Sequence, residues 1–167
     1  MKKVFPLILM LIAVVAVNAK IKITSGSADF LKDKATAVLV MDYSEATWEE
    51  DEPYQTWCGE DFDERVKISY NSFATGFNKE SDDLKIRQDD PSAKYRITIK
   101  ISVMEQKMAG WGRFYMMCSG TLVVEEIATG KVVCTAKIKR EDGNDDYVPN
   151  DRVAKCFFAL GDAVADM

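Results

Sequence analysis

The stretch Lys94–Glu105 reads KYRITIKISVME and has the most regular hydropathy pattern in the chain. Its apolar positions are Tyr95, Ile97, Ile99, Ile101 and Val103, and its polar positions are Lys94, Arg96, Thr98, Lys100 and Ser102. Successive side chains of a β-strand point to opposite faces of a sheet, so this alternation predicts a strand with one buried and one solvated face. Such one-sided burial is typical of antiparallel sheets whose helices cover a single face.

Further strands are predicted on both sides of this stretch. Phe114–Ile127 and Lys131–Arg140 form a hairpin around Ala128-Thr129-Gly130, where Gly130 can adopt the positive φ of a tight turn. Thr36–Tyr43 (TAVLVMDY) would be apolar on both faces of a strand, which favours a central, largely buried strand. Leu84–Gln88 is predicted to form a short strand.

Two segments have the periodicity of amphipathic helices. The first is predicted from about Phe62 to Lys79, with Asp61 and Glu64 as a capping box; its apolar face is Phe62, Val66, Ser69, Phe73 and Phe77. The second follows the polar loop Glu141–Pro149 and is capped by Asn150 or Asp151. Its apolar stripe is Val153, Phe157, Leu160 and Val164, with Cys156 at the edge.

These elements follow the order β-α-β-β-β-β-α and predict an α+β fold. Only a sheet is present to receive the two helices, so we expect a two-layer sandwich. Its sheet is mixed, mostly antiparallel and of about five strands, with both helices on one face. Residues 20–167 are expected to form a single domain. Within it, the acidic stretch Glu45–Asp61, which contains Trp48 and Trp57, is expected to be a long loop.

The first nineteen residues have the pattern of a secretory signal peptide. Met1–Lys3 is positively charged, Val4–Val17 is almost entirely apolar, and Ala19 precedes the expected cleavage point. The apolar run of 14 residues is shorter than the roughly 20 that span a bilayer, and no cysteine follows it. We therefore expect a mature chain starting at Lys20, periplasmic or secreted, with no stable membrane anchor.

The composition excludes several function classes. The chain of 167 residues carries 22 Lys and Arg against 27 Asp and Glu, which gives a net charge of −5, and it has no histidine. An acidic balance argues against a general nucleic-acid binder, which needs a basic surface. Without histidine the commonest general base and the commonest zinc ligand are missing, so we expect neither an enzyme nor a cofactor.

The four cysteines allow three complete sets of disulfides. In the predicted hairpin Cys118 lies opposite residue 140 or 141, roughly 20 Å along the strand from Cys134, which is too far for a bond. Cys134 should face the last helix, so a disulfide between Cys134 and Cys156 is the candidate pairing. The alternative is that all four are buried thiols that pack as small hydrophobic residues.

Candidate binding residues lie in three places. The solvated face of the central strand offers Arg96 and Lys100, and the acidic loop offers Trp48 and Trp57. The segment Met108–Met117 (MAGWGRFYMM) is either a mobile aromatic lip for a peptide, glycan or protein, or a strand entry that completes the core. Its candidate contacts are Trp111, Arg113 and Tyr115.

A weak metal candidate lies in the loop that follows the hairpin. Asp142, Asn144 and Asp146 have the oxygen ligands that calcium prefers, but the loop does not match an EF-hand. The alternative is a plain acidic turn.

Several segments together resemble a known envelope module. They are TAVLVMDY from Thr36, the helix end FATGFNKE, the strand KYRITIKISV, the hairpin GTLVVEEIATGKVVCTAKI and the last helix DRVAKCFFALGDAVADM. Over about Thr36–Met167 they are similar to the α/β module of the periplasmic amino-terminal domain of TolB and of CsgG-like secretion proteins. The resemblance implies an envelope protein that assembles with other proteins and has no catalytic residues. The missing lipobox cysteine and the acidic insertion depart from it, so neither a lipid anchor nor a pore is implied.

The sequence leaves three functions open. The first is an exported, non-enzymatic binding or assembly module of the bacterial envelope, with an envelope or extracellular protein, or a second copy, as its partner. The second is a carboxylate-dependent hydrolase of envelope sugars, which needs two acids about 5–10 Å apart in one cleft. The third is a calcium or small-ligand binder that uses the acidic loops.

Overall fold

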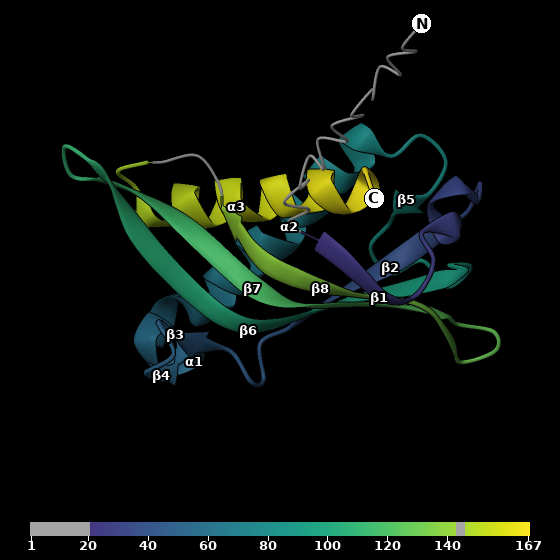
Figure 1. The fold of residues 1–167 in the computed structure, drawn as a ribbon, viewed down its shortest axis with the longest axis horizontal. Coiled ribbons are helices and arrows are strands. Elements are labelled where there is room, and N and C mark those ends of the chain that lie inside the picture. The colour runs from purple at the N-terminus through teal and green to yellow at the C-terminus, as the bar shows by residue number, and fades with distance from the viewer. Residues whose placement is uncertain (1–20, 143–145) are drawn as a thin grey trace, which may run out of the picture.

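The computed structural model describes residues 21–142 and 146–167 (Figure 1). The predicted signal peptide, residues 1–19, lies outside the described residues. The strands are β1 (Ile21–Gly26), β2 (Thr36–Asp42), β3 (Thr47–Trp48), β4 (Glu52–Pro53), β5 (Lys85–Ile86), β6 (Tyr95–Gly110), β7 (Arg113–Glu126) and β8 (Lys131–Asp142). The helices are α1 (Tyr54–Cys58), α2 (Phe62–Glu80) and α3 (Pro149–Ala165), with 3-10 turns at Asp29–Lys32 and Gly59–Asp61.

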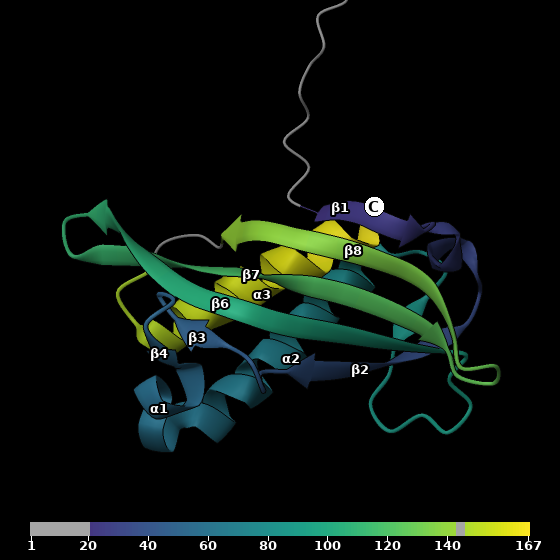
Figure 2. The same ribbon diagram turned by 60° about the horizontal axis from the view of Figure 1, so that its bottom comes forward.

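The strands form one open, mixed sheet, and α2 and α3 lie side by side across one of its faces (Figures 1 and 2). The strand order is β1-β8-β7-β6-β2-β5, with β3 and β4 attached beside β6. β6, β7, β8 and β1 are antiparallel neighbours, whereas β2 runs parallel to β6. The α+β content and the two helices agree with the prediction. The expected five strands are wrong, because the sheet has eight.

The core-facing side of β6 follows the predicted alternation until a bulge. Ile97 and Ile99 are fully buried, and Ile101 is 2% exposed. The register with β7 then shifts between Ile101 and Val103, which turns Met104 into the core in place of Val103. A bulge inserts one extra residue into a strand and so reverses the faces beyond it. The prediction for Val103 is wrong for this reason.

The two long helices cross at glycines. A Cβ built on Gly161 would lie 2.1 Å from the Phe73 carbonyl oxygen, and one built on Gly76 would lie 2.2 Å from that of Phe158. The backbones therefore meet without side chains between them, which lets both helices reach the same sheet face. The predicted stripe of α3 is confirmed, since Val153, Phe157, Leu160 and Val164 are all fully buried.

The acidic segment is ordered, contrary to the long loop expected. β3 and β4 form a small hairpin with Thr47 opposite Pro53, and α1 follows at once. Apolar side chains hold it, since Trp48 is 7% and Tyr54 1% exposed. Sequence reasoning weighed the charges of this segment and missed that its aromatic residues reach the core.

Three smaller expectations also fail. β2 is not buried on both faces, because helices cover only one face of the sheet and Val40 on the other is 39% exposed. The capping box at Asp61 does not form, since its carboxylate accepts a hydrogen bond from Arg65 instead. α3 begins at Pro149 with Val148 as its cap residue, two or three residues before the predicted cap at Asn150 or Asp151.

Candidate functional site: the open face of the sheet

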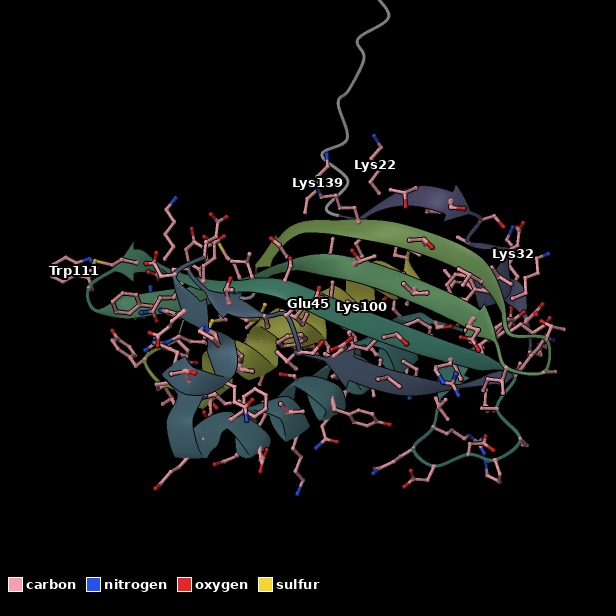
Figure 3. All side chains as sticks on the ribbon, turned by 90° about the horizontal axis from the view of Figure 1, so that it is seen from below. Lys22, Lys32, Glu45, Lys100, Trp111 and Lys139 are labelled. Carbon is pink, nitrogen blue, oxygen red and sulfur yellow. The ribbon has the colours of Figure 1, made fainter. Side chains whose placement is uncertain are left out.

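The face of the sheet opposite the helices is polar and carries a group of basic side chains, seen from its own side in Figure 3. We call this surface the open face. Its exposed basic residues are Lys22 on β1, Arg96 and Lys100 on β6, and Lys137 and Lys139 on β8. Hydroxyl side chains separate them, among them Thr98, Thr121 and Thr135. The predicted positions Arg96 and Lys100 therefore lie on one surface with three lysines that sequence reasoning did not select.

Strand register aligns part of this face into a row. Lys22 lies directly opposite Lys137, Lys137 opposite Thr121, and Thr121 opposite Lys100. Adjacent strands are about 4.8 Å apart, so the row places three cations across four strands. Like charges directly opposite one another destabilise a sheet. The Lys22–Lys137 pair is therefore unfavourable for folding as it stands.

Few carboxylates balance these charges. Arg96 pairs with Glu125 at 3.3 Å. Lys100 lies opposite Asp42, whose pKa is lowered chiefly by a hydrogen bond from the Ser44 hydroxyl, with the lysine charge as a smaller cause. Within the described part of the chain, Lys22, Lys100, Lys137 and Lys139 form no ion pair. The open face is thus locally cationic in a chain with a net charge of −5.

Lys94, which the alternation also assigned to this face, lies outside it. Its ammonium pairs with Asp33 at 2.5 Å and lies 5.0 Å from the centre of the Tyr95 ring. The Tyr95 hydroxyl donates to the same carboxylate. This cluster fastens the Asp29–Lys32 turn to the start of β6, and we assign it a structural role.

The aromatic candidates of the acidic segment are structural as well. The rings of Trp48 and Trp57 stack with centroids 3.6 Å apart, and the Arg65 guanidinium lies 4.7 Å from the Trp57 ring. Trp48 is buried and Trp57 is half-buried. Neither ring presents the free face that a binding aromatic needs.

The remaining aromatic candidates lie on the β6–β7 hairpin, away from the centre of the open face (Figure 3). Trp111 is at the turn and is 95% exposed. Arg113 is also exposed, whereas Tyr115 is half-buried opposite Lys107. The base of the hairpin therefore packs against the rest of the fold, as in the strand-entry alternative. Its tip is exposed, as in the aromatic-lip alternative.

The weak metal site has no support in the described residues. Asn144 and the side chain of Asp142 lie outside them. The Asp146 carboxylate accepts hydrogen bonds from Lys155 at 2.5 Å and from the Val148 N–H at 3.1 Å, and the first of these chiefly lowers its pKa to about 2. Elsewhere in the described ranges, no three His, Cys, Asp or Glu side chains gather as metal ligands.

The structure carries all four cysteines as buried thiols, without the candidate Cys134–Cys156 disulfide. Cys118 does lie opposite Glu141, as the hairpin geometry predicted. Burial raises the pKa of Cys134 and of Cys58. A raised pKa disfavours the thiolate form, so these two thiols are poor nucleophiles.

Five carboxyl groups of the described residues have a lowered pKa. Asp29, Asp33, Asp42, Asp90 and Asp146 all have a lowered pKa, in each case chiefly through a side-chain hydrogen bond. The general acid of a glycoside hydrolase needs a raised pKa. The hydrolase alternative stays a prediction.

No protein-family model and no curated protein matches the chain. Among solved structures, it is similar to the PelC dodecamer of Paraburkholderia phytofirmans, with 14% identity, 86% of this chain and 96% of that chain covered, and a TM-score of 0.49. It is also similar to protein XCC0632 of Xanthomonas campestris, with 10% identity, coverage of 79% and 80%, and a TM-score of 0.46. Likenesses this low assign no function. The resemblance to TolB and CsgG-like proteins stays a prediction.

No helix of the described residues is long and apolar enough to cross a membrane.

Proposed function

We propose that this protein is an exported, non-enzymatic binding module of the bacterial cell envelope. Its binding surface is the open face, and its partner presents an acidic protein surface. The location rests on the signal-peptide pattern of residues 1–19. The binding role rests on the observations below.

The observation that carries the proposal is the pairing of Lys22 with Lys137 beside Lys139 and Lys100. A folded sheet gains nothing from lysines placed opposite each other. An acidic partner would turn this repulsion into attraction. Complementary potentials also raise the rate of association and exclude partners of the wrong charge.

The shape of the open face favours a macromolecule over a small ligand. The face is built from regular strands and bears short hydroxyl side chains between the lysines. A hollow of about 420 Å³ is found elsewhere, between α2 and α3, where Asn71, Thr75 and Phe158 line it. A broad sheet surface suits the interfaces of about 800 Å² per partner that proteins form with each other.

The proposal is tested by reversing the charge of the open face. We expect the immobilised mature chain to capture an envelope protein at low salt. The double variant Lys22→Glu/Lys137→Glu should capture at least tenfold less of that protein. Lys67→Glu makes the matched control, because Lys67 is exposed on α2. Calorimetry with polyglutamate serves as a defined acidic probe. Equal capture by the double variant and the wild type, or capture insensitive to salt, would overturn the proposal.

A further inference from the structure

The tip of the β6–β7 hairpin exposes apolar side chains at a projecting end of the molecule (Figures 1 and 3). We call residues 107–113 the hairpin tip. Trp111 is 95% exposed and Met108 is 62% exposed. Nearby, Phe114 bridges to Asp146, and the next two residues after Asp146, Tyr147 and Val148, are 62% and 49% exposed. Four of the seven large hydrophobic residues that the described chain exposes therefore belong to this end.

The backbone of the tip holds the indole in a conformation that such a residue rarely adopts. Gly110, Trp111 and Gly112 have φ values of 112°, 53° and 76°. Positive φ at both central residues defines the type I′ turn, which strongly favours Asn and Gly at the position that Trp111 occupies. A bulky residue with positive φ is an outlier. A strained, unburied tryptophan gives the fold nothing, which points to a role in binding.

The base beneath the tip is fixed. The Arg152 guanidinium lies 5.0 Å from the centre of the Phe114 ring and donates to the Gln106 side chain at 3.1 Å. It also donates to the backbone carbonyls of Asp146 and Tyr147. These contacts join β6, β7 and the start of α3, so the tip is presented on a defined support.

The hairpin tip itself carries basic side chains and no carboxylate. Lys107 and Arg113 are its two end residues, and residues 106–124 contain no Asp or Glu, although the chain has 27 of them. The carboxylate of Asp146, which bridges to Phe114, is paired with Lys155. A Trp with a neighbouring apolar side chain and basic flanks matches the water–lipid interface, where indole rings sit at the headgroup level. Basic residues near an anionic bilayer add to the attraction.

We infer that the hairpin tip docks reversibly on a bilayer that contains anionic phospholipids. Trp111 and Met108 enter the interface, and Lys107 faces the headgroups. A bilayer is favoured over a protein because the tip is convex and narrow, and a lipid surface needs no matching hollow. This inference concerns a surface distinct from the open face and does not depend on the proposed function.

The test measures association with vesicles of phosphatidylcholine with about a third phosphatidylglycerol. Trp48 and Trp57 are stacked against each other and covered to different degrees, so Trp111 is the tryptophan that lipid contact would change most. We expect a blue shift of the fluorescence and quenching by brominated lipid. Both should be absent in Trp111→Ser, with vesicle binding reduced at least tenfold. Lys107→Glu should weaken binding several-fold on anionic vesicles and little on pure phosphatidylcholine.

All variants are compared on the chain from Lys20 onward, because the apolar run Val4–Val17 would itself bind lipid. This chain retains every core residue of the described fold. Val132→Ser is the matched control, since Val132 is 48% exposed beside the turn at the other end of β7. Unchanged melting temperatures confirm that the variants fold.

Three outcomes would overturn the inference. The first is that Trp111→Ser binds vesicles as strongly as the wild type does. The second is that the wild type binds no vesicles at any lipid composition. The third is a fluorescence shift of Trp111 that depends on protein concentration in the absence of lipid. The last would assign the tip to a second copy of the chain.

Discussion

Two buried tyrosines differ in a single hydrogen bond. The Tyr43 hydroxyl donates to the Ser69 hydroxyl at 2.7 Å, and Ser69 in turn donates to the Arg65 carbonyl. The Tyr54 hydroxyl is equally enclosed, but it lies near the Cys58 thiol and forms no hydrogen bond of normal geometry. Their rings stack with centroids 5.6 Å apart, so both contribute to the same aromatic cluster. The two residues offer a matched comparison within one environment.

We expect Tyr43→Phe to lower the free energy of unfolding by about 1 kcal/mol, because a satisfied buried hydrogen bond is lost. Tyr54→Phe should leave this free energy unchanged or raise it, because it removes a buried hydroxyl that has no good partner. Urea unfolding monitored by circular dichroism measures both. Equal losses in the two variants would show that the Tyr54 hydroxyl is satisfied after all.

At the scale of elements, the crossing of α2 and α3 decides how the helical layer covers the sheet. Gly76 and Gly161 each face a backbone carbonyl of the other helix at a distance that admits no Cβ. Backbone atoms yield less readily than the ends of side chains. The crossing thus fixes the distance between the helices, and with it the depth to which Phe73 and Phe157 enter the core.

Gly161→Ala reverses the usual effect of this substitution in a helix. Alanine is normally favoured over glycine there by about 1 kcal/mol. Here we expect a loss of about 1–3 kcal/mol, because the added methyl overpacks a closed contact. Asp162→Ala is the adjacent control and should change stability by less than about 0.5 kcal/mol, since Asp162 makes only a 3.9 Å ion contact with Lys79. A stabilised Gly161→Ala protein would show that the helices can separate at no cost.

At the scale of the whole molecule, two carboxylates tie separate elements together. Asp33 binds Lys94 and Tyr95, and Asp146 binds Lys155 and the start of α3. The pKa of each carboxyl is lowered, chiefly by hydrogen bonds from these lysines. A carboxyl whose pKa is lower in the folded state stabilises the fold above its unfolded pKa and loses that effect as the pH falls through its folded pKa.

We therefore expect the melting temperature to fall as the pH drops from about 4 toward 2, the interval between the ordinary Asp value of 3.8 and the pKa of about 2 for Asp146. Asp146→Asn should melt lower than the wild type at pH 6 and depend less steeply on pH across this interval. Asp63→Asn, at an exposed position on α2, provides the control. Scanning calorimetry at several pH values measures the slopes. Parallel slopes for wild type and Asp146→Asn would contradict the expected role of this carboxylate.

The elements that could be predicted from the sequence are those with a regular hydrophobic periodicity. The strand from Tyr95 to Ile101, the helix from Phe62 and the stripe of α3 were all predictable, because their alternation or helical spacing extends over many residues. β1 carries the same alternation at Ile21 and Ile23 but is only six residues long and follows the signal-peptide pattern, so it was overlooked. The bulge after Ile101 has no local signal, because pairing with β7 sets it.

The candidate site was predictable only in part for a related reason. Arg96 and Lys100 follow from the alternation of one strand. Lys137 joins them through the register of β8 with β7, and Lys22 only through the register of β1 with β8, which pairs two strands that are far apart in the sequence. Trp48 was misjudged because its acidic neighbours obscured its burial. Trp111 was selected because its segment is rich in aromatic residues and glycine. Its exposure depends on the geometry of the turn, which the spacing of residues in the sequence does not reveal.

The pairing of β1 with β8 also constrains the order of folding. Ile21 aligns with Ile138, so the amino-terminal strand must wait until nearly the whole chain has been delivered before it finds its neighbour. Contacts between such distant positions form late, because closing the long intervening loop costs entropy. During synthesis, β1 would emerge among the first strands and pair last. The edge strand β1 should therefore be the first strand to separate from the sheet. We expect its amide hydrogens to exchange faster than those of the other strands.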